Sequence, residues 1–370
     1  MTNQYGEMMT GIPNGRATTS PGSGRLGGAC GSRCSGWSGG VLATYRCYVP
    51  SGDFWPAARP AFRRNDSALP YGAVVEEILA VAAPEAEGAA EAEDTPEARG
   101  PSLSPSRAAD FMTCPLLYRF RVIDRLPEPP TEATARGTLV HAALERLFDL
   151  PAASRTPEAA RDLLSPEWDR LAAEEPALAA LFPDPAERTV WLRSATAILD
   201  AYFTLEDPRR LEPASRECYV ETALPSGLRL RGYIDRLDVA PGGEIRIVDY
   251  KTGKAPREAY EASALFQMKF YALVIWRLRG VVPRVLQLMY LAEGQVLRYS
   301  PDEADLRATE RKLEALWSAI SRAREAGDWR PRPSRLCDWC NHKAFCPEFG
   351  GTLPPLPVPG PADAPAPATR

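Results

Sequence analysis

Apolar residues recur at helical spacing in several stretches after residue 100. In RGTLVHAALERLFDL, residues 136–150, the side chains of Val140, Leu144, Leu147 and Phe148 fall on one face of a helix. The segment LSPSRAADFMTCPLLYRFRVIDRL begins like a capped helix with an apolar face and continues as either a strand or a helix. The same spacing predicts two helices within 157–206, a long helix at 257–279 and a helix at 302–326.

Short apolar runs predict strands between these helices. A strand region begins at 215–224, and the runs GYIDRLDVA and EIRIVDYKTG flank the turn Pro241-Gly242-Gly243, which predicts a hairpin. One or two further strands are expected in RVLQLMYLAEG and QVLRYS. This order predicts an α/β fold with a mixed sheet, helices packed against it, and a helical insertion at about 155–210.

Composition divides the chain into an ordered domain and two flanking segments. Residues 1–75 are rich in Gly, Ser, Pro and Arg, which predicts either a disordered extension or a coding sequence assigned too early a start. Residues 76–100 read as an acidic linker, so 1–100 is expected to lie outside the folded domain. The domain itself is expected at 101–350, followed by a disordered Pro/Ala-rich tail at 351–370.

The net charge of −4 is misleading as a guide to partners. Residues 76–98 hold eight acidic residues and no base, so the rest of the chain carries +4 and can present basic surface to phosphates. No apolar run reaches the ~18 residues that a transmembrane helix requires, and the N-terminus does not resemble a signal peptide. The cysteines lack a secreted-domain pattern, which favours a cytoplasmic protein that makes no use of a membrane.

The predicted hairpin gathers groups that suit a divalent metal and a phosphate. Pairing makes Asp235 and Asp249 neighbours, and the period of two places Asp249 and Lys251 on one side. Mg²⁺ prefers such carboxylate oxygens, and the carbonyl of Tyr250 would face the same site. Lys251 could orient the attacking water or stabilise the charge that develops on phosphorus, and Glu217 could add a carboxylate.

His141 is a further candidate because the chain has only two histidines. It precedes Glu145 by four residues, so both project from one helical face, away from the apolar face. It could supply an imidazole ligand or a phosphate contact, or it could be an ordinary surface or core histidine. The acidic hairpin likewise has an ordinary interpretation as a solvated charged face, but Ile245, Ile247 and Val248 indicate a buried strand with a polar end.

Four segments in order, GTLVHAALE, GYIDRLD, IVDYKTGK and FQMKFYA, resemble the RecB-type nuclease domain of the PD-(D/E)xK superfamily. The resemblance covers roughly 102–350 and implies a restriction-endonuclease-like core with DNA cleavage that depends on Mg²⁺ or Mn²⁺. It implies that His141, Asp235, Asp249 and Lys251 are active-site residues. It also matches Glu217 to an acidic position upstream of the hairpin, and Gln267 and Tyr271 to residues that support the lysine or contact DNA.

Three cysteines near the C-terminus, Cys337, Cys340 and Cys346, have the spacing of ligands to one metal centre. A fourth ligand could be His342 or the distant Cys114. The sequence around these residues resembles AddB-type and CRISPR-associated nucleases, which implies Cys114 and a four-iron, four-sulfur (4Fe-4S) cluster that ties the two ends of the domain together. A structural Zn²⁺ is the alternative, and we expect Trp339 and Phe345 to shield the centre from water.

These observations predict a metal-dependent DNA nuclease of the RecB exonuclease type that acts in repair or recombination on single-stranded or unwound ends. The chain has no GxxxxGK(S/T) phosphate loop, so a separate helicase would supply unwound DNA. The alternative is a DNA-binding or scaffolding module that keeps the fold and the metal cluster without catalysis.

Overall fold

The computed structural model describes residues 101–255 and 261–357, with side chains left out at 261–263. All of these residues lie within one compact unit, Tyr45–Arg370. The expectations for 1–100 and for the last part of the tail, 358–370, fall outside the described residues.

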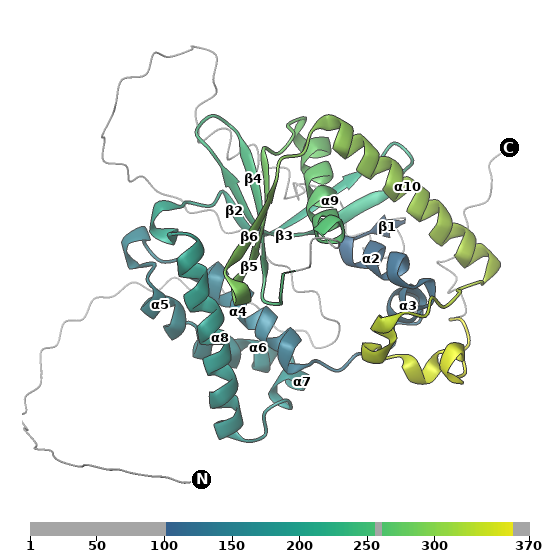
Figure 1. The fold of residues 1–370 in the computed structure, drawn as a ribbon, viewed down its shortest axis with the longest axis horizontal. Helices are drawn as coiled ribbons and strands as arrows, with labels where there is room; N and C mark the ends of the chain where they lie inside the picture. The colour runs from purple at the N-terminus through teal and green to yellow at the C-terminus, as the bar shows by residue number, and fades with distance from the viewer. Residues whose placement is uncertain (1–100, 256–260, 358–370) are drawn as a thin grey trace, which may run out of the picture. The chain divides into compact units, whose positions relative to one another are not determined.

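The described part of the chain folds around a six-stranded mixed sheet with the order β1-β3-β4-β5-β6, in which β2 pairs with β3 (Figure 1). The β2–β3, β3–β4 and β5–β6 pairs are antiparallel, whereas β1–β3 and β4–β5 are parallel. The predicted fold class is thereby confirmed. The strands are β1 (Ser102–Leu103), β2 (Ser215–Ala223), β3 (Arg229–Val239), β4 (Ile245–Lys251), β5 (Val285–Tyr290) and β6 (Gln295–Tyr299).

One edge of β3 is shared between two neighbours, and this division creates an opening in the sheet. β1 pairs with Arg229 and Leu230 at the start of β3, while β4 pairs with Arg236–Val239 at its end. No strand pairing is recorded along this edge for 231–235 among the described residues, although β2 follows the opposite edge of β3 for nearly its whole length. The backbone of 231–235 is therefore accessible to side chains and ligands.

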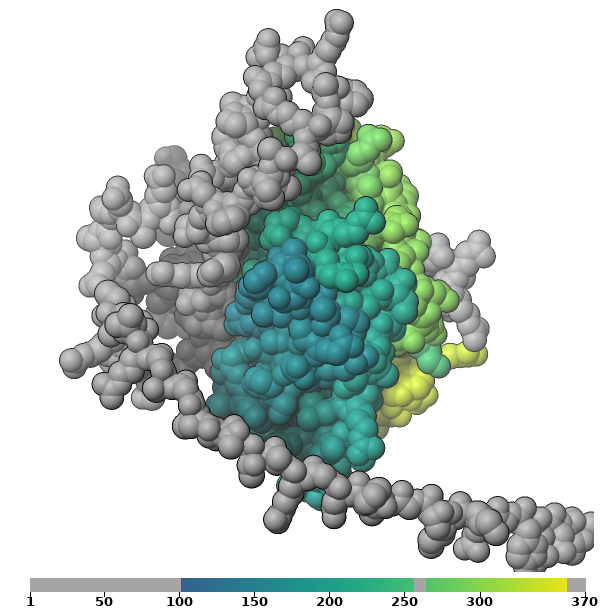
Figure 2. All heavy atoms as spheres, turned by 90° about the vertical axis from the view of Figure 1, so that its left-hand side faces the viewer, coloured from purple at the N-terminus to yellow at the C-terminus, as the bar shows by residue number. Residues whose placement is uncertain are grey.

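Helices cover both faces of the sheet, and β4 shows which residues meet which layer. Its Ile245 and Ile247 join the core made with α2, α3, α9 and α10, whereas Val248 and Tyr250 join the core made with α4–α8. Figure 2 looks onto the layer α4–α8. The helices are α2 (Pro105–Thr113), α3 (Pro115–Tyr118), α4 (Glu132–Leu147), α5 (Pro157–Asp162), α6 (Leu164–Glu174), α7 (Pro176–Ala179), α8 (Pro185–Leu205), α9 (Glu261–Arg279) and α10 (Glu303–Ala326).

The structure corrects one sequence-based expectation about these elements and decides between two alternatives in another. Residues 157–206 form four helices instead of two, because Pro157, Pro176 and Pro185 each begin a new helix at a position where proline is favoured. The exit from the first helical segment is helical, through a π-helical turn at Arg119–Ile123, and not a strand. The expectation that α5–α8 are an insertion stays a prediction.

None of the helices in the described ranges combines the length and the apolar character that crossing a bilayer would demand.

Candidate active site

α4 brings His141 to the end of β4. The helix begins with a capping box between Thr131 and Thr134, which fixes its first turn. Gly137 allows a close approach to the sheet, because a Cβ at that position would lie 3.2 Å from Thr252 Oγ1. One turn later, His141 Nε2 lies 2.9 Å from the carbonyl oxygen of Tyr250.

Two carboxylates from β2 and β3 face the same imidazole. His141 Nδ1 lies 3.5 Å from Asp235 Oδ2 and 3.8 Å from Glu217 Oε1, and one donor atom from each residue fits within 4.8 Å of the other two. Glu217 stands opposite Asp235 in the β2–β3 register, and its φ of 42° lies in the left-handed region that side chains rarely adopt. This backbone strain marks the residue as held for a purpose beyond strand pairing.

Asp235 lies on β3 immediately before the residues that pair with β4, and its carboxylate takes the place of a backbone hydrogen-bond acceptor for β4. Its Oδ2 accepts a hydrogen bond of 2.7 Å from the backbone N–H of Tyr250, which the interrupted ladder leaves without a strand partner on β3. The bond therefore holds the carboxylate beside the end of β4.

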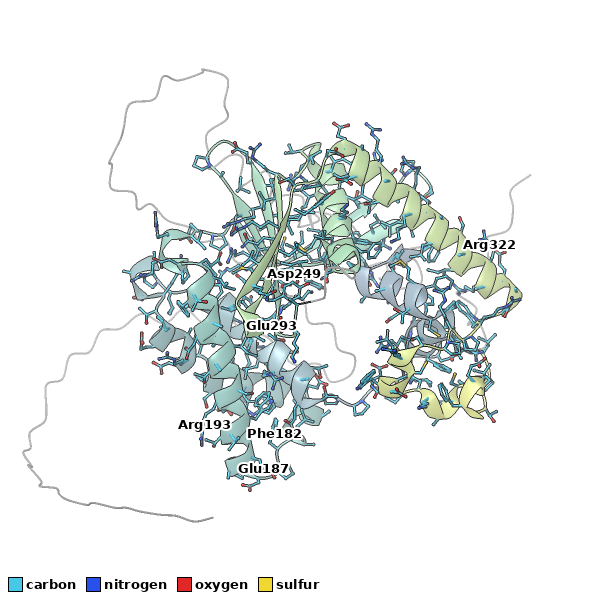
Figure 3. All side chains as sticks on the ribbon, in the orientation of Figure 1. Phe182, Glu187, Arg193, Asp249, Glu293 and Arg322 are labelled. Atoms are coloured by element: carbon cyan, nitrogen blue, oxygen red, sulfur yellow. The ribbon has the colours of Figure 1, made fainter. Side chains whose placement is uncertain are left out.

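Asp249, which Figure 3 labels, and Lys251 contact the opposite layer, where α9 supplies Gln267. Lys251 Nζ lies 2.6 Å from Asp249 Oδ2 and donates to Gln267 Oε1 at 2.9 Å, while Gln267 Nε2 donates to Asp249 Oδ1 at 2.8 Å. These contacts close a ring of three side chains. The Asp249 side chain is only 3% exposed, so the ring holds a buried carboxylate in a fixed orientation.

Crowding of acids shifts the protonation of the site. Burial, and then the charge of Asp249, raises the pKa of Asp235 to about 7. Burial alone would lower the pKa of His141, but Asp235, Glu217 and Asp249 outweigh it and raise that pKa to about 9. For Lys251, Asp249 likewise outweighs burial and raises the pKa above its usual range. In the absence of a cation, the site therefore retains protons that isolated groups would release.

Tyr271 closes the opening in the sheet and has no direct contact with Lys251 among the described interactions. A Cβ on Gly232 would lie 2.8 Å from the Tyr271 ring, so only glycine permits this approach. The phenol is close enough to hydrogen-bond the backbone of Tyr233 and the side chain of Gln267, and burial is the main cause that raises its pKa. It thus stabilises the unpaired edge of β3 and the residue that holds the lysine.

Sequence reasoning missed a buried ion pair beneath the site. Arg236 is fully buried, pairs with Glu206 and Asp238, and donates to Tyr250 Oη at 2.5 Å. It also lies over the rings of Phe148 and Tyr250. Arg236 thereby fixes the side chain of Tyr250, whose carbonyl faces His141. An arginine inside an apolar strand was the available signal, but its partner Glu206 lies 30 positions away in the sequence.

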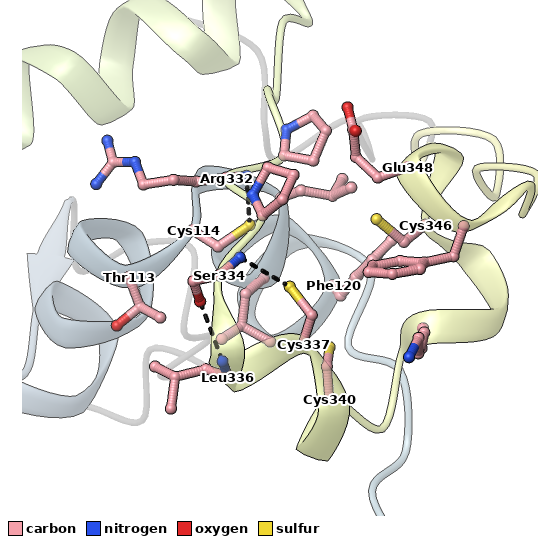
Figure 4. Close-up of a pocket in the computed structure, with 16 residues that line it drawn as sticks. Thr113, Cys114, Phe120, Arg332, Ser334, Leu336, Cys337, Cys340, Cys346 and Glu348 are labelled. Carbon is pink, nitrogen blue, oxygen red and sulfur yellow. Dashed lines mark hydrogen bonds between the residues drawn. The ribbon is translucent and has the colours of Figure 1, made fainter.

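The structure brings all four predicted cysteines around one hollow (Figure 4). The cavity volume of this hollow is about 50 Å³. Backbone N–H groups of Arg332 and Ser334 donate to two of the sulfurs, each at 3.3 Å. The sulfur atoms belong to Cys114, which follows α2, and to Cys337, Cys340 and Cys346.

Three neighbouring residues differ from their expected roles. His342 is buried with its Nε2 2.6 Å from Glu128 Oε1, and it does not line the cysteine hollow. Trp339 is 76% exposed and Phe345 is 41% exposed, and neither lines the hollow. The structure therefore does not support the expectation that these aromatic residues shield the centre, although Phe345 packs behind Phe120 with ring centroids 6.3 Å apart. Phe120, Leu116 and Leu336 line the hollow in their place.

Comparison with known proteins identifies relatives. Residues 102–347 match the family described as the PD-(D/E)XK nuclease superfamily. The chain is 25% identical over 277 residues to the Gene 69 protein of Mycobacterium phage D29, covering 67% of this chain and 97% of that protein. It is 29% identical over 126 residues to the Gene 69 protein of phage L5, covering 33% of this chain but only 41% of that one. A crystal structure of a candidate exonuclease from Eubacterium rectale is 15% identical with a TM-score of 0.44, covering 69% and 93% of the two chains.

Proposed function

The chain belongs to the PD-(D/E)XK nuclease superfamily, and on this premise we propose that it is a metal-dependent deoxyribonuclease of the RecB exonuclease type. The observation that carries the proposal is the meeting of two sets of side chains at the end of β4. One set is the cation-binding group of His141, Glu217 and Asp235, and the other is the ring of Asp249, Lys251 and Gln267.

The donor atoms fit Mg²⁺ or Mn²⁺. Adjacent ligands of an octahedral ion bound at 2.0–2.1 Å lie about 3 Å apart. His141 Nδ1 lies 3.5 Å from Asp235 Oδ2 and 3.8 Å from Glu217 Oε1, close to that spacing, while Nε2 lies 2.9 Å from the carbonyl oxygen of Tyr250. Asp235 and Glu217 supply the oxygens that these ions prefer, and Asp249 lies outside this group of donors but adds its negative charge. A divalent cation would relieve the repulsion that keeps the site protonated.

A bound cation would supply an activated water and neutralise charge on the phosphate. Lys251 contributes a second positive charge, because its raised pKa keeps the ammonium protonated at neutral pH. The ammonium can therefore donate to a phosphate oxygen or to water. Gln267 fixes the direction of Nζ by accepting one of its hydrogen bonds, and it holds Asp249 with its amide.

The assignment is tested by cleavage of end-labelled single-stranded DNA with the full chain in Mn²⁺ or Mg²⁺. We expect Asp249→Ala and Lys251→Ala each to lower the rate at least about a hundredfold, since each removes charge at the reacting phosphate. Lys269→Ala is the matched control, because that lysine lies on α9 but bonds to Tyr299 and Asp305 instead. Undiminished cleavage by both site variants would remove the assignment. A wild-type chain that binds DNA without cutting it would favour the non-catalytic alternative.

For the cysteine hollow we propose a 4Fe-4S cluster held by Cys114, Cys337, Cys340 and Cys346. The N–H groups aimed at two sulfurs suit thiolates, whose charge they stabilise. Zn²⁺ held by the same four thiolates is the alternative, and quantification of iron and zinc in the purified chain distinguishes the two.

The proposed cellular role is processing of single-stranded or unwound DNA ends in repair or recombination, with a separate helicase to open the duplex. Its support is the nuclease family together with the site, and the relatives encoded by phages are compatible with DNA metabolism in general. Exonuclease action is tested by comparing linear with circular single-stranded substrates. Equal degradation of both would refute it.

A further inference from the structure

A groove of about 630 Å³ lies beside the opening in the sheet. The start of α2 forms one wall, the unpaired part of β3 forms another, and α9 contributes a third. Its volume falls within the range of pockets that hold ligands of nucleotide size. The polar and aromatic side chains in its lining that bear on ligand binding are Arg107, Tyr219, Arg231, Tyr233, Lys251 and Gln267.

Two arginines in this groove lie within electrostatic reach of each other, and neither forms an ion pair of its own among the described residues. Neither Arg107 nor Arg231 forms an ion pair with a carboxylate among the described residues, although most other buried or half-buried arginines here do. Burial, and then the nearby charge of Arg231, lowers the pKa of Arg107. Among the described residues, its guanidinium makes one side-chain hydrogen bond, a long one of 3.5 Å to Ser102 Oγ. No Asp or Glu lines the groove. Glu221, the cross-strand partner of Arg231, is close enough for the charge of Arg231 to lower its pKa, but its carboxylate is bonded by Arg229 and Tyr219, so the two guanidinium groups keep positive charge for a further anion.

A tyrosine pair offers an aromatic surface at the same place. Tyr219 and Tyr233 are cross-strand partners on β2 and β3, with ring centroids 5.2 Å apart at 57°. Tyr219 is anchored, because its hydroxyl donates to Glu221. Tyr233 is 42% exposed, and it is one of the few large apolar side chains outside the C-terminal cysteine segment with such exposure. An anchored ring beneath an exposed one is a platform on which a base can stack.

The groove leads directly to the proposed catalytic lysine. Lys251 and Gln267 line it at one end, and the same two side chains close the ring with Asp249. A strand that placed a phosphate at Lys251 would extend along the groove past the arginine pair to the tyrosines. Bases of a duplex are already stacked on each other and cannot stack on an exposed ring, which favours an unpaired strand.

We propose that this groove binds the single-stranded part of a DNA substrate, with a base stacked on Tyr233 and a phosphate held between Arg107 and Arg231. The proposal rests on the nuclease function proposed above and defines its substrate as an unpaired strand. The arginine pair positions the backbone without reading sequence, and the stacked base tolerates any nucleotide. Arg107 and Arg231 are therefore positioning residues, and they are separate from the groups that contact the reacting phosphate.

The test measures binding of a fluorescent oligothymidylate to the full chain in buffer with a chelator, so that cleavage is not required. Tyr233→Ala should weaken binding about five- to a hundredfold, whereas Tyr233→Phe, which keeps the ring, should bind like wild type. Arg107→Gln and Arg231→Gln should each reduce the slope of log affinity against log salt by about 0.7, as expected for one lost phosphate contact. Arg193→Gln, on the exposed face of α8 (Figure 3), is the matched charge control and should change neither quantity.

Several results would overturn the proposal. Binding by the Tyr233→Ala and arginine variants that equals wild type would exclude the groove, and equal losses in Tyr233→Phe and Tyr233→Ala would exclude stacking. Equally tight binding of a blunt duplex, weakened by the same substitutions, would show that the groove takes paired DNA. Tighter binding of oligouridylate would assign RNA. If the wild-type chain fails to cleave DNA but binding still depends on Tyr233, the nuclease function fails while the groove stands.

Discussion

Replacing Asp235 by asparagine should stabilise the metal-free protein while abolishing its response to metal. Burial and the charge of Asp249 raise the pKa of Asp235 from 3.8 to about 7. Since one pKa unit corresponds to about 1.4 kcal/mol, ionising this carboxyl in the folded chain costs at most about 4 kcal/mol. The amide keeps an oxygen that can accept the hydrogen bond from the Tyr250 N–H, but it carries no charge.

The net gain should be smaller than this limit, because His141 loses an opposite charge in the variant. We expect the free energy of unfolding to rise by about 1–2 kcal/mol near pH 8. A raised pKa means that the folded state holds the proton longer than the unfolded chain, so the penalty is absent below about pH 4 and complete above about pH 7. The difference in the free energy of unfolding between the variant and wild type should therefore grow between these two pH values.

Urea unfolding followed by tryptophan fluorescence in metal-free buffer, at several pH values, provides the measurement. Asp238→Asn is the control on the same strand: it removes an ion-pair partner of Arg236 and Arg246 and should destabilise the protein by roughly 1–3 kcal/mol. Added Mn²⁺ should stabilise the wild type and leave Asp235→Asn unchanged. The reasoning would be refuted if Asp235→Asn were no more stable than wild type near pH 8. It would also be refuted if the gain in the free energy of unfolding were as large near pH 4 as near pH 8.

Three further predictions follow from other contacts. The carboxylates raise the pKa of His141 to about 9 against the effect of burial, and a protonated imidazole cannot bind a cation. The affinity for Mn²⁺, measured by calorimetry, should therefore increase between about pH 6 and 9. An affinity that does not change with pH would contradict this. Cys114→Ser should lower both bound iron and the thermal midpoint, whereas Cys218→Ser, in the sheet, should keep its iron; equal iron in both would exclude Cys114 as a ligand. Gly232→Ala forces the Tyr271 ring to move, which should lower the free energy of unfolding by about 1–3 kcal/mol and also slow DNA cleavage. Urea unfolding measures the first effect, and cleavage of end-labelled DNA measures the second. A variant that matches wild type in both would show that the ring has room to accommodate the methyl group.

The hairpin that carries the site could be predicted from sequence because its physical causes are local. The Pro241-Gly242-Gly243 turn, the apolar run before Asp249 and the period of two together determine which side chains share a face. Helical spacing in the same way placed Gln267 on the helix that packs over Lys251. The roles of these residues in catalysis stay predictions, whereas the mixed sheet with flanking helices is confirmed.

What sequence could not predict depends on contacts between distant segments. The opening in the sheet arises because the two-residue β1 and the hairpin strand β4 share one edge of β3, and a two-residue strand has no periodic signal. The left-handed backbone of Glu217 is equally invisible, because glutamate is not a residue type that favours it. Four helices in place of two were missed because a proline can begin a helix or interrupt one, and spacing alone does not distinguish these cases.

The alternation of β4 has a consequence for how such a protein can diverge. Tyr250 belongs to the layer α4–α8, while Asp249 and Lys251 on either side of it belong to the layer of α9. The helices α5–α8 can therefore be lengthened, trimmed or exchanged over generations without displacing the ammonium group. Two constraints remain on that half of the molecule: α4 must present one imidazole to the carbonyl of Tyr250, and the end of α8 must keep Glu206 paired with Arg236, which holds the Tyr250 side chain.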